Sequence, residues 1–162
     1  MKKLAVFLLL VLMASLLGSG YLYMTCGLGV KGVEVTATEA ESYGELFDYL
    51  QHAMQLNAVT GTRFSSNIPG DVENYQFLTF TVELDNKAFI QADQVEIQVS
   101  PVAEDMLQLA EETRYSVDAR SSGKVQATIL TQANAHPVRE LFITYYMWGI
   151  PMSIRTNSSV SQ

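Results

Sequence analysis

The chain opens with an apolar segment that carries no charge. Two lysines, Lys2 and Lys3, precede residues 4–30, in which no Asp, Glu, Lys or Arg occurs. A helix over residues 4–24 is about 31 Å long at ~1.5 Å per residue, which matches a hydrocarbon core of about 30 Å. The sequence therefore predicts an N-terminal transmembrane helix in contact with membrane lipid through residues 4–24, within a signal anchor and juxtamembrane segment over residues 1–30.

The two lysines set the expected orientation. Positive residues stay on the cytoplasmic side, so we expect a single-pass protein of the cell membrane with its N-terminus in the cytoplasm and its C-terminal domain outside. Tyr21 and Tyr23 then fall at the outer interface. A cleaved signal peptide and a secreted product are the alternative, because residues 4–17 have the length of an h-region and residues 18–20 are small.

The chain has one cysteine, Cys26, so an intrachain disulfide is excluded and the domain must be held by its own core. Lipid attachment at this cysteine is a further interpretation. Tyr23, Met24 and Thr25 precede it, however, where a bacterial lipobox has small residues. We therefore expect no lipidation.

Alternation of apolar and polar residues predicts strands beyond residue 31. It is clearest over residues 75–84, which end in a turn at 85–87, with residues 88–90 expected to continue extended. Residues 138–148 are apolar on both faces, which is typical of a central strand. Residues 101–113 fit a strand or a helical turn. The other expected strands cover residues 33–38, 95–99, 115–119, 125–129 and 152–155.

One helix is expected over residues 43–56, with Ser42 and Glu45 as a capping box. Residues 57–74 read as a long loop. About seven strands with turns every 8–12 residues predict a mainly β fold, an antiparallel β-sandwich with this one α-helix inserted. We expect the domain over residues 31–155 and a flexible tail over 156–162. The apolar stripe of the helix consists of Leu46, Phe47, Leu50, Ala53 and Met54.

Residues 75–86, YQFLTFTVELDN, resemble the opening strand and Asn-containing turn of small exported immunoglobulin-like domains of the FxLYD or LEA-type-2 kind. The resemblance extends over residues 72–155, and the helix at 43–56 departs from it. It implies an immunoglobulin-like sandwich with a binding or scaffolding role. It implies no catalytic residues.

The remaining composition argues against several kinds of chemistry. The net charge is −7, with no basic run, which disfavours nucleic-acid binding. His52 and His136 lack a second ligand at metal-binding spacing, and no Gly-x-Ser-x-Gly turn occurs. The acidic pairs 104–105 and 111–112 read as solvated loops. We expect no enzyme activity, no cofactor and no metal.

Two sets of residues are candidates for contacts with other molecules. Tyr145, Tyr146 and Trp148 either fill the core or form a contact surface. The small residues Ser15, Gly18 and Gly20 allow close approach of a partner helix. We expect a membrane-anchored binding or scaffolding domain that contacts an envelope protein or a surface ligand. The alternative is a small accessory subunit that packs through its transmembrane helix.

Overall fold

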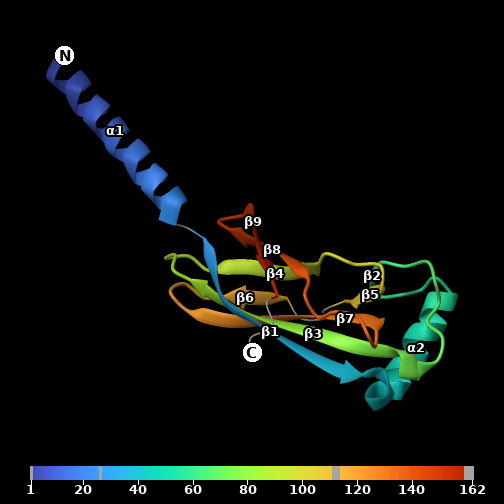
Figure 1. The fold of residues 1–162 in the computed structure, drawn as a ribbon. Helices are drawn as coiled ribbons and strands as arrows, with labels where there is room; N and C mark the ends of the chain where they lie inside the picture. The colour runs from blue at the N-terminus through green and yellow to red at the C-terminus, as the bar shows by residue number, and fades with distance from the viewer. Residues whose placement is uncertain (1, 26, 111–113, 159–162) are drawn as a thin grey trace.

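A computed structural model of the chain shows a long N-terminal helix followed by a domain of two antiparallel sheets (Figure 1). The structure describes residues 2–25, 27–110 and 114–158, and within the helix it leaves out the side chains of residues 2, 5 and 22–25. Cys26, on which the lipidation question turns, therefore lies outside the described residues.

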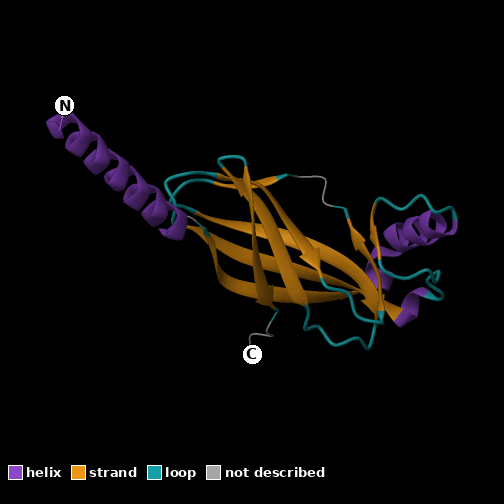
Figure 2. Ribbon diagram, turned by 90° about the horizontal axis from the view of Figure 1, so that it is seen from above, coloured by secondary structure: helices purple, strands orange, loops and turns teal. Residues whose placement is uncertain are grey.

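Helix α1 (Lys2–Thr25) is 24 residues long and extends away from the sheets (Figures 1 and 2). Its apolar side chains from Leu4 to Tyr21, where described, are exposed on every side of the helix. The expected transmembrane helix is not found, since no helix in the described part of the chain is both long enough and apolar enough to cross a membrane.

The described residues form nine strands rather than the seven expected. They are β1 (Leu28–Glu39), β2 (Gly61–Arg63), β3 (Tyr75–Asn86), β4 (Ala92–Val99), β5 (Asp105–Leu109), β6 (Tyr115–Val117), β7 (Ser122–Gln132), β8 (Glu140–Met147) and β9 (Ile150–Asn157). The larger sheet has the order β1-β3-β7-β5-β2, and the smaller has the order β6-β4-β8-β9. The expected mainly β, antiparallel architecture is confirmed.

The two sheets share one hydrophobic core, as in a β-sandwich. The predicted inward face of β3 contributes Leu78, Phe80, Val82 and Leu84, each with 0% exposure. Side chains of the second sheet pack against it, because alternate residues of a strand point to one face. They are Val95, Ile97 and Val99 of β4 and Leu141, Ile143, Tyr145 and Met147 of β8.

Strand β8 is central in its sheet, as expected, but only one of its faces is buried. Phe142 is partly exposed, and Tyr146 is exposed on the same outward face. The Arg155 guanidinium lies over the Phe142 ring, 4.6 Å from its centroid. The expectation of two buried faces was wrong, because a cation and solvent, rather than a further layer, cover this apolar face.

Helix α2 (Gly44–Gln55) lies within a residue of the predicted bounds and covers a second, smaller core. Its buried residues are Phe47, Leu50, Ala53 and Met54, and only Leu46 of the expected stripe is exposed. The capping box was wrong. Ser42 lies in a 3-10 turn, η1 (Ala40–Tyr43), which makes Tyr43 the N-cap, with no capping bond from its side chain.

Four connecting segments differ from the expectation. The long loop at 57–74 contains β2 and a 3-10 turn, η2 (Val72–Asn74). Residues 88–90 form a bend instead of continuing extended, and the ambiguous segment at 101–113 contains β5. In the tail, Ser158 is buried and its Oγ accepts a hydrogen bond from the Arg139 amide at 2.7 Å. This first part of the tail is thus fixed by a specific contact.

A buried glutamine joins the two sheets. Gln108 of β5 donates from Nε2 to the Ile97 carbonyl at 2.6 Å, and its Oε1 accepts from the Val99 amide at 2.9 Å. Both partners belong to β4 in the opposite sheet. The glutamine therefore supplies two buried hydrogen bonds to the backbone of β4.

We predict that Gln108→Met lowers the free energy of unfolding by about 1–3 kcal/mol, because an amide and a carbonyl lose their partners inside the protein. Urea denaturation of the purified chain measures this. Gln126→Met is the matched control, since Gln126 is exposed and bonds only Thr81. The control is expected to change stability by less than about 0.5 kcal/mol.

Candidate functional site

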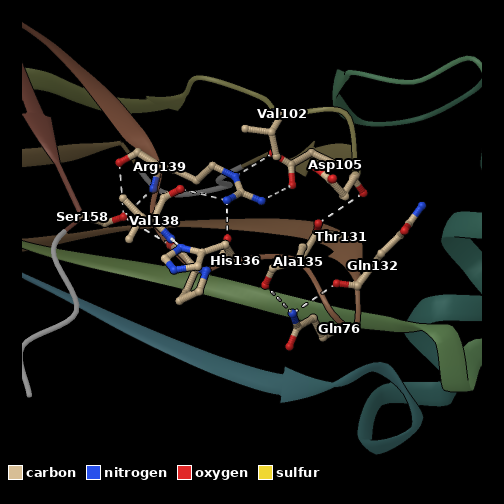
Figure 3. A network of polar contacts seen from close by, with 12 residues as sticks. Gln76, Val102, Asp105, Thr131, Gln132, Ala135, His136, Val138, Arg139 and Ser158 are labelled. Carbon is tan, nitrogen blue, oxygen red and sulfur yellow. Dashed lines mark hydrogen bonds and ion pairs between the residues drawn. The ribbon is translucent and has the colours of Figure 1, made fainter.

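A buried ion pair is the first candidate for a site (Figure 3). Asp105 begins β5, and Arg139 lies just before β8 in the opposite sheet. The Arg139 Nε donates to Asp105 Oδ2 at 2.9 Å, and Nη2 donates to Oδ1 at 2.8 Å. The side chains are 0% and 2% exposed. The pair has the two-pronged geometry that a guanidinium and a carboxylate favour.

The rest of the network satisfies this pair. The Val102 amide donates to Asp105 Oδ2 at 2.9 Å, and Arg139 Nη1 donates to the carbonyls of His136 and Val138. Among the described residues, no buried side-chain nitrogen or oxygen lacks a hydrogen-bond partner. Asp105 is thus engaged by Arg139, which argues against a solvated acidic loop at 104–105. The network joins the sheets, and each of its buried side-chain nitrogens and oxygens already has a partner within the described protein.

We predict that Asp105→Asn lowers the free energy of unfolding by about 3–5 kcal/mol, because the Arg139 charge then stays buried without its counter-ion. Thermal or urea denaturation measures the loss. Glu140→Gln is the control, since the Glu140–Arg155 pair is exposed and worth about 0–1 kcal/mol. Equal losses in the two variants would contradict a special role for the buried pair.

The histidines do not form a metal site in the described part of the chain. His52 is exposed on α2. His136 is exposed in the loop before β8, and its Nδ1 accepts a hydrogen bond from the Val138 amide at 3.2 Å. No group of three or more described His, Cys, Asp or Glu side chains could hold a metal ion. Glu111 and Glu112, the second acidic pair, lie outside the described residues.

A cleft with a volume of about 730 Å³ runs along β4, β5 and the ends of β8 and β9. Its charged lining residues are Glu96 and Arg114, and its lining includes no histidine, lysine or cysteine.

The second candidate is the end of the sandwich where α1 joins it. The strand register pairs Leu28 with Asn86 and Met147 with Ile150, so three connections lie at this end. They are the β3–β4 loop (87–91), the β6–β7 loop (118–121) and the β8–β9 turn (148–149), which with Ile150 we name the loop end. The same loops are seen beside the base of α1 in Figure 2.

Asn86 organises the loop end from inside. It is 1% exposed, and its Nδ2 donates to the carbonyls of Ile90, Val117 and Asp118 at 2.7, 3.0 and 3.1 Å. Its Oδ1 accepts from the Ala88 amide at 3.0 Å. These bonds tie two loops together, so this asparagine has a structural role in the turn.

Three large apolar side chains are exposed at the loop end. Phe89 and Trp148 are each 68% exposed, and Ile150 is 51% exposed. The guanidinium of Arg120 lies over the Phe89 ring at 4.0 Å, and the Arg120 amide donates to the Ala88 carbonyl at 3.1 Å. Large apolar side chains gathered on one exposed end are a feature of interaction sites.

The structure separates the three aromatic candidates of β8 and its turn. Tyr145 is 2% exposed, so it belongs to the core and not to a surface, and its hydroxyl accepts a hydrogen bond from the Leu28 amide at 3.2 Å. Tyr146 and Trp148 are exposed. Sequence reasoning missed Phe89 and Ile150. The turn chemistry at Asn86 was the signal that residues 88–90 leave the sheet.

The β8–β9 turn holds its tryptophan in an unfavourable backbone conformation. Trp148 has a φ of 52° and Gly149 a φ of 72°, and the strands on either side pair at Met147 and Ile150. Positive φ at both central residues defines the type I′ hairpin turn, which favours Asn-Gly. A bulky side chain in this region is an outlier and costs about 1–2 kcal/mol.

We predict that Trp148→Asn raises the free energy of unfolding by about 1 kcal/mol, because asparagine tolerates this φ far better than tryptophan does. Gly149→Ala is the matched variant, and its expected effect on the free energy of unfolding is the opposite one. The space around its missing Cβ is open within 4 Å, so its expected loss of about 1 kcal/mol comes from the backbone alone. A Trp148→Asn variant that unfolds more easily than the wild type would show that the indole contributes packing of its own.

The small residues of α1 do not form one stripe. Gly18 and Gly20 are two residues apart, about 200° around the helix, whereas Ser15 and Gly18 share a face. The positions of a Cβ on either glycine have no heavy atom within 4 Å. The Ser15 hydroxyl donates to the Leu12 carbonyl at 2.8 Å within the helix. One partner helix can therefore face Ser15 and Gly18 but not Gly20 as well.

No protein-family model matches this chain, and no curated protein matches it as a relative. The class of protein is thus defined by its own fold and surface: an antiparallel, sandwich-like β domain carried on a long apolar helix. The apolar loop end beside that helix is its candidate functional site.

Proposed function

We propose that α1 anchors the chain in a lipid bilayer and that the β domain is an extracytoplasmic binding or scaffolding module. The observation that carries this proposal is the exposure of α1. Leu8, Leu12 and Leu17 are 58%, 57% and 71% exposed, and the described side chains around them are exposed too. Covering this much apolar surface is favourable by about 25 cal/mol per Å².

The distribution of charge supports one orientation. Lys2 and Lys3 lie at the free end of α1, and the domain lies at its other end (Figure 1). Basic residues beside an anchor stay on the cytoplasmic side of a membrane. The domain then lies outside the cytoplasm, at the cell membrane.

The strand order supports an immunoglobulin-like domain. In chain order, β1, β3, β4, β5, β7, β8 and β9 fill the places of strands A to G, since one sheet contains β1-β3-β7-β5 and the other β4-β8-β9. The short strands β2 and β6 and the helix α2 are additions to that plan. Domains of this architecture present loops and strand edges to a partner, here an envelope protein or a surface ligand.

We predict that Leu9→Arg combined with Leu12→Arg releases the chain from membranes. Each arginine costs about 2.5–3.5 kcal/mol at the centre of a membrane helix. The measurement is the fraction of chain, tagged after Gln162, that remains in the pellet after alkaline extraction. Leu9→Ile combined with Leu12→Ile keeps the segment apolar and is expected to remain in the pellet with the wild type.

The same experiment separates the proposal from its alternatives. A wild-type chain that appears in the alkaline supernatant at full length would overturn the anchor. A shortened chain recovered outside the cells would instead show that the apolar segment is a cleaved signal peptide.

A further inference from the structure

We infer that the loop end docks on the surface of the same bilayer that holds α1, with Phe89, Trp148 and Ile150 in the interfacial layer. This inference rests on the proposed function, because it needs α1 in a membrane. It adds a second lipid contact, made by the folded domain itself, which fixes how the domain stands relative to the membrane.

The connection between helix and domain is short. α1 ends at Thr25 and β1 begins at Leu28, and the three Cα–Cα steps between these two residues span at most about 11 Å. The Leu28 amide donates to the Tyr145 hydroxyl at 3.2 Å, and a Cβ on Gly27 would lie 3.7 Å from the same oxygen. The start of β1, just after the helix, is thus bonded to β8 at Tyr145, three residues before Trp148.

The side chains at the loop end have the chemistry of a membrane interface. Tryptophan and tyrosine are enriched there because an apolar ring carries a polar group that stays hydrated. Trp148 is joined by the apolar side chains of Phe89 and Ile150. Tyr21, in the last turns of α1, is 69% exposed and lies at the end of the helix that is next to the domain.

Charge also turns this end toward a lipid surface. Arg120 and Lys87 are exposed on the loop end, where they suit lipid phosphates, against one exposed carboxylate, Asp118. The opposite end of the sandwich, around α2, is acidic and is repelled by an anionic surface. Its exposed acidic residues are Glu39, Glu41, Glu45, Asp48, Asp71 and Glu73.

A bilayer is favoured over a protein partner at this end because α1 already brings the bilayer there. A protein bound to the loop end would have to fit between the domain and the membrane, across a connection of two residues. The lipid contact continues the surface that α1 itself requires, and it needs no further partner.

The test uses the sole tryptophan, Trp148, as its reporter in the full-length chain. The protein is reconstituted into detergent-free vesicles of phosphatidylcholine and phosphatidylglycerol. The Trp148 fluorescence in these vesicles is compared with that in matching vesicles whose lipids are brominated either near the headgroup or near the end of the acyl chain. We expect a blue-shifted emission, several-fold weaker quenching by aqueous acrylamide, and stronger quenching by the shallow bromines than by the deep ones.

Two variants make the result specific. Phe89→Ser combined with Ile150→Ser is expected to return Trp148 toward a water-exposed emission and to abolish most of the quenching by bromines. Tyr49→Ser combined with Leu56→Ser removes exposed apolar side chains at the α2 end, 59% and 64% exposed, and is expected to leave the fluorescence unchanged.

Vesicle flotation after alkaline washing reads the anchor independently. A chain that floats but whose Trp148 stays open to acrylamide would overturn the docking and leave the proposed function standing. A chain that does not float would overturn both. Protection from acrylamide without quenching by bromines would assign the loop end to a second copy of the chain, and not to lipid.

Discussion

Hydrogen bonds that cross the core hold the two sheets in register. The chain has a single cysteine, so no intrachain disulfide can join the sheets instead. Gln108 bonds the backbone of β4 from β5, and Asp105 binds Arg139 at the end near α2. Asn86 does the same at the loop end, where its amide donates to the Val117 carbonyl. Apolar contacts are not directional, so these polar contacts determine how the residues of one sheet align with those of the other.

Much of the fold follows from local patterns in the sequence. The alternation around Leu78 and Ile97 identified strands and inward faces, because a strand buries every second residue. Short strands such as β2 leave no such pattern, since three residues are too few to show a period. The 3-10 turn that displaces Ser42 from the N-cap is set by packing of Ala40, which is fully buried, and local capping rules do not include that contact.

The candidate surface could be predicted only in part. Period two separates Tyr145 from Tyr146, and the structure places one in the core and the other outside. The sequence could not place Phe89 at the same end of the sandwich as Trp148, because that placement depends on which strand ends meet across two sheets. It also could not reveal that Trp148 occupies a position of positive φ, since Trp-Gly is not a turn signature.

The conformation of Trp148 is most easily understood together with its exposure. A tryptophan at positive φ costs about 1–2 kcal/mol of backbone strain. The side chain is 68% exposed, so packing within the domain offsets little of that strain. Covering about 100 Å² of the ring would stabilise the chain by about 2.5 kcal/mol at ~25 cal/mol per Å². The strain is therefore offset only when another surface covers the loop end. α1 ends two residues before β1, the strand whose Leu28 amide bonds Tyr145, so the apolar helix and the strained turn are positioned to meet the same surface.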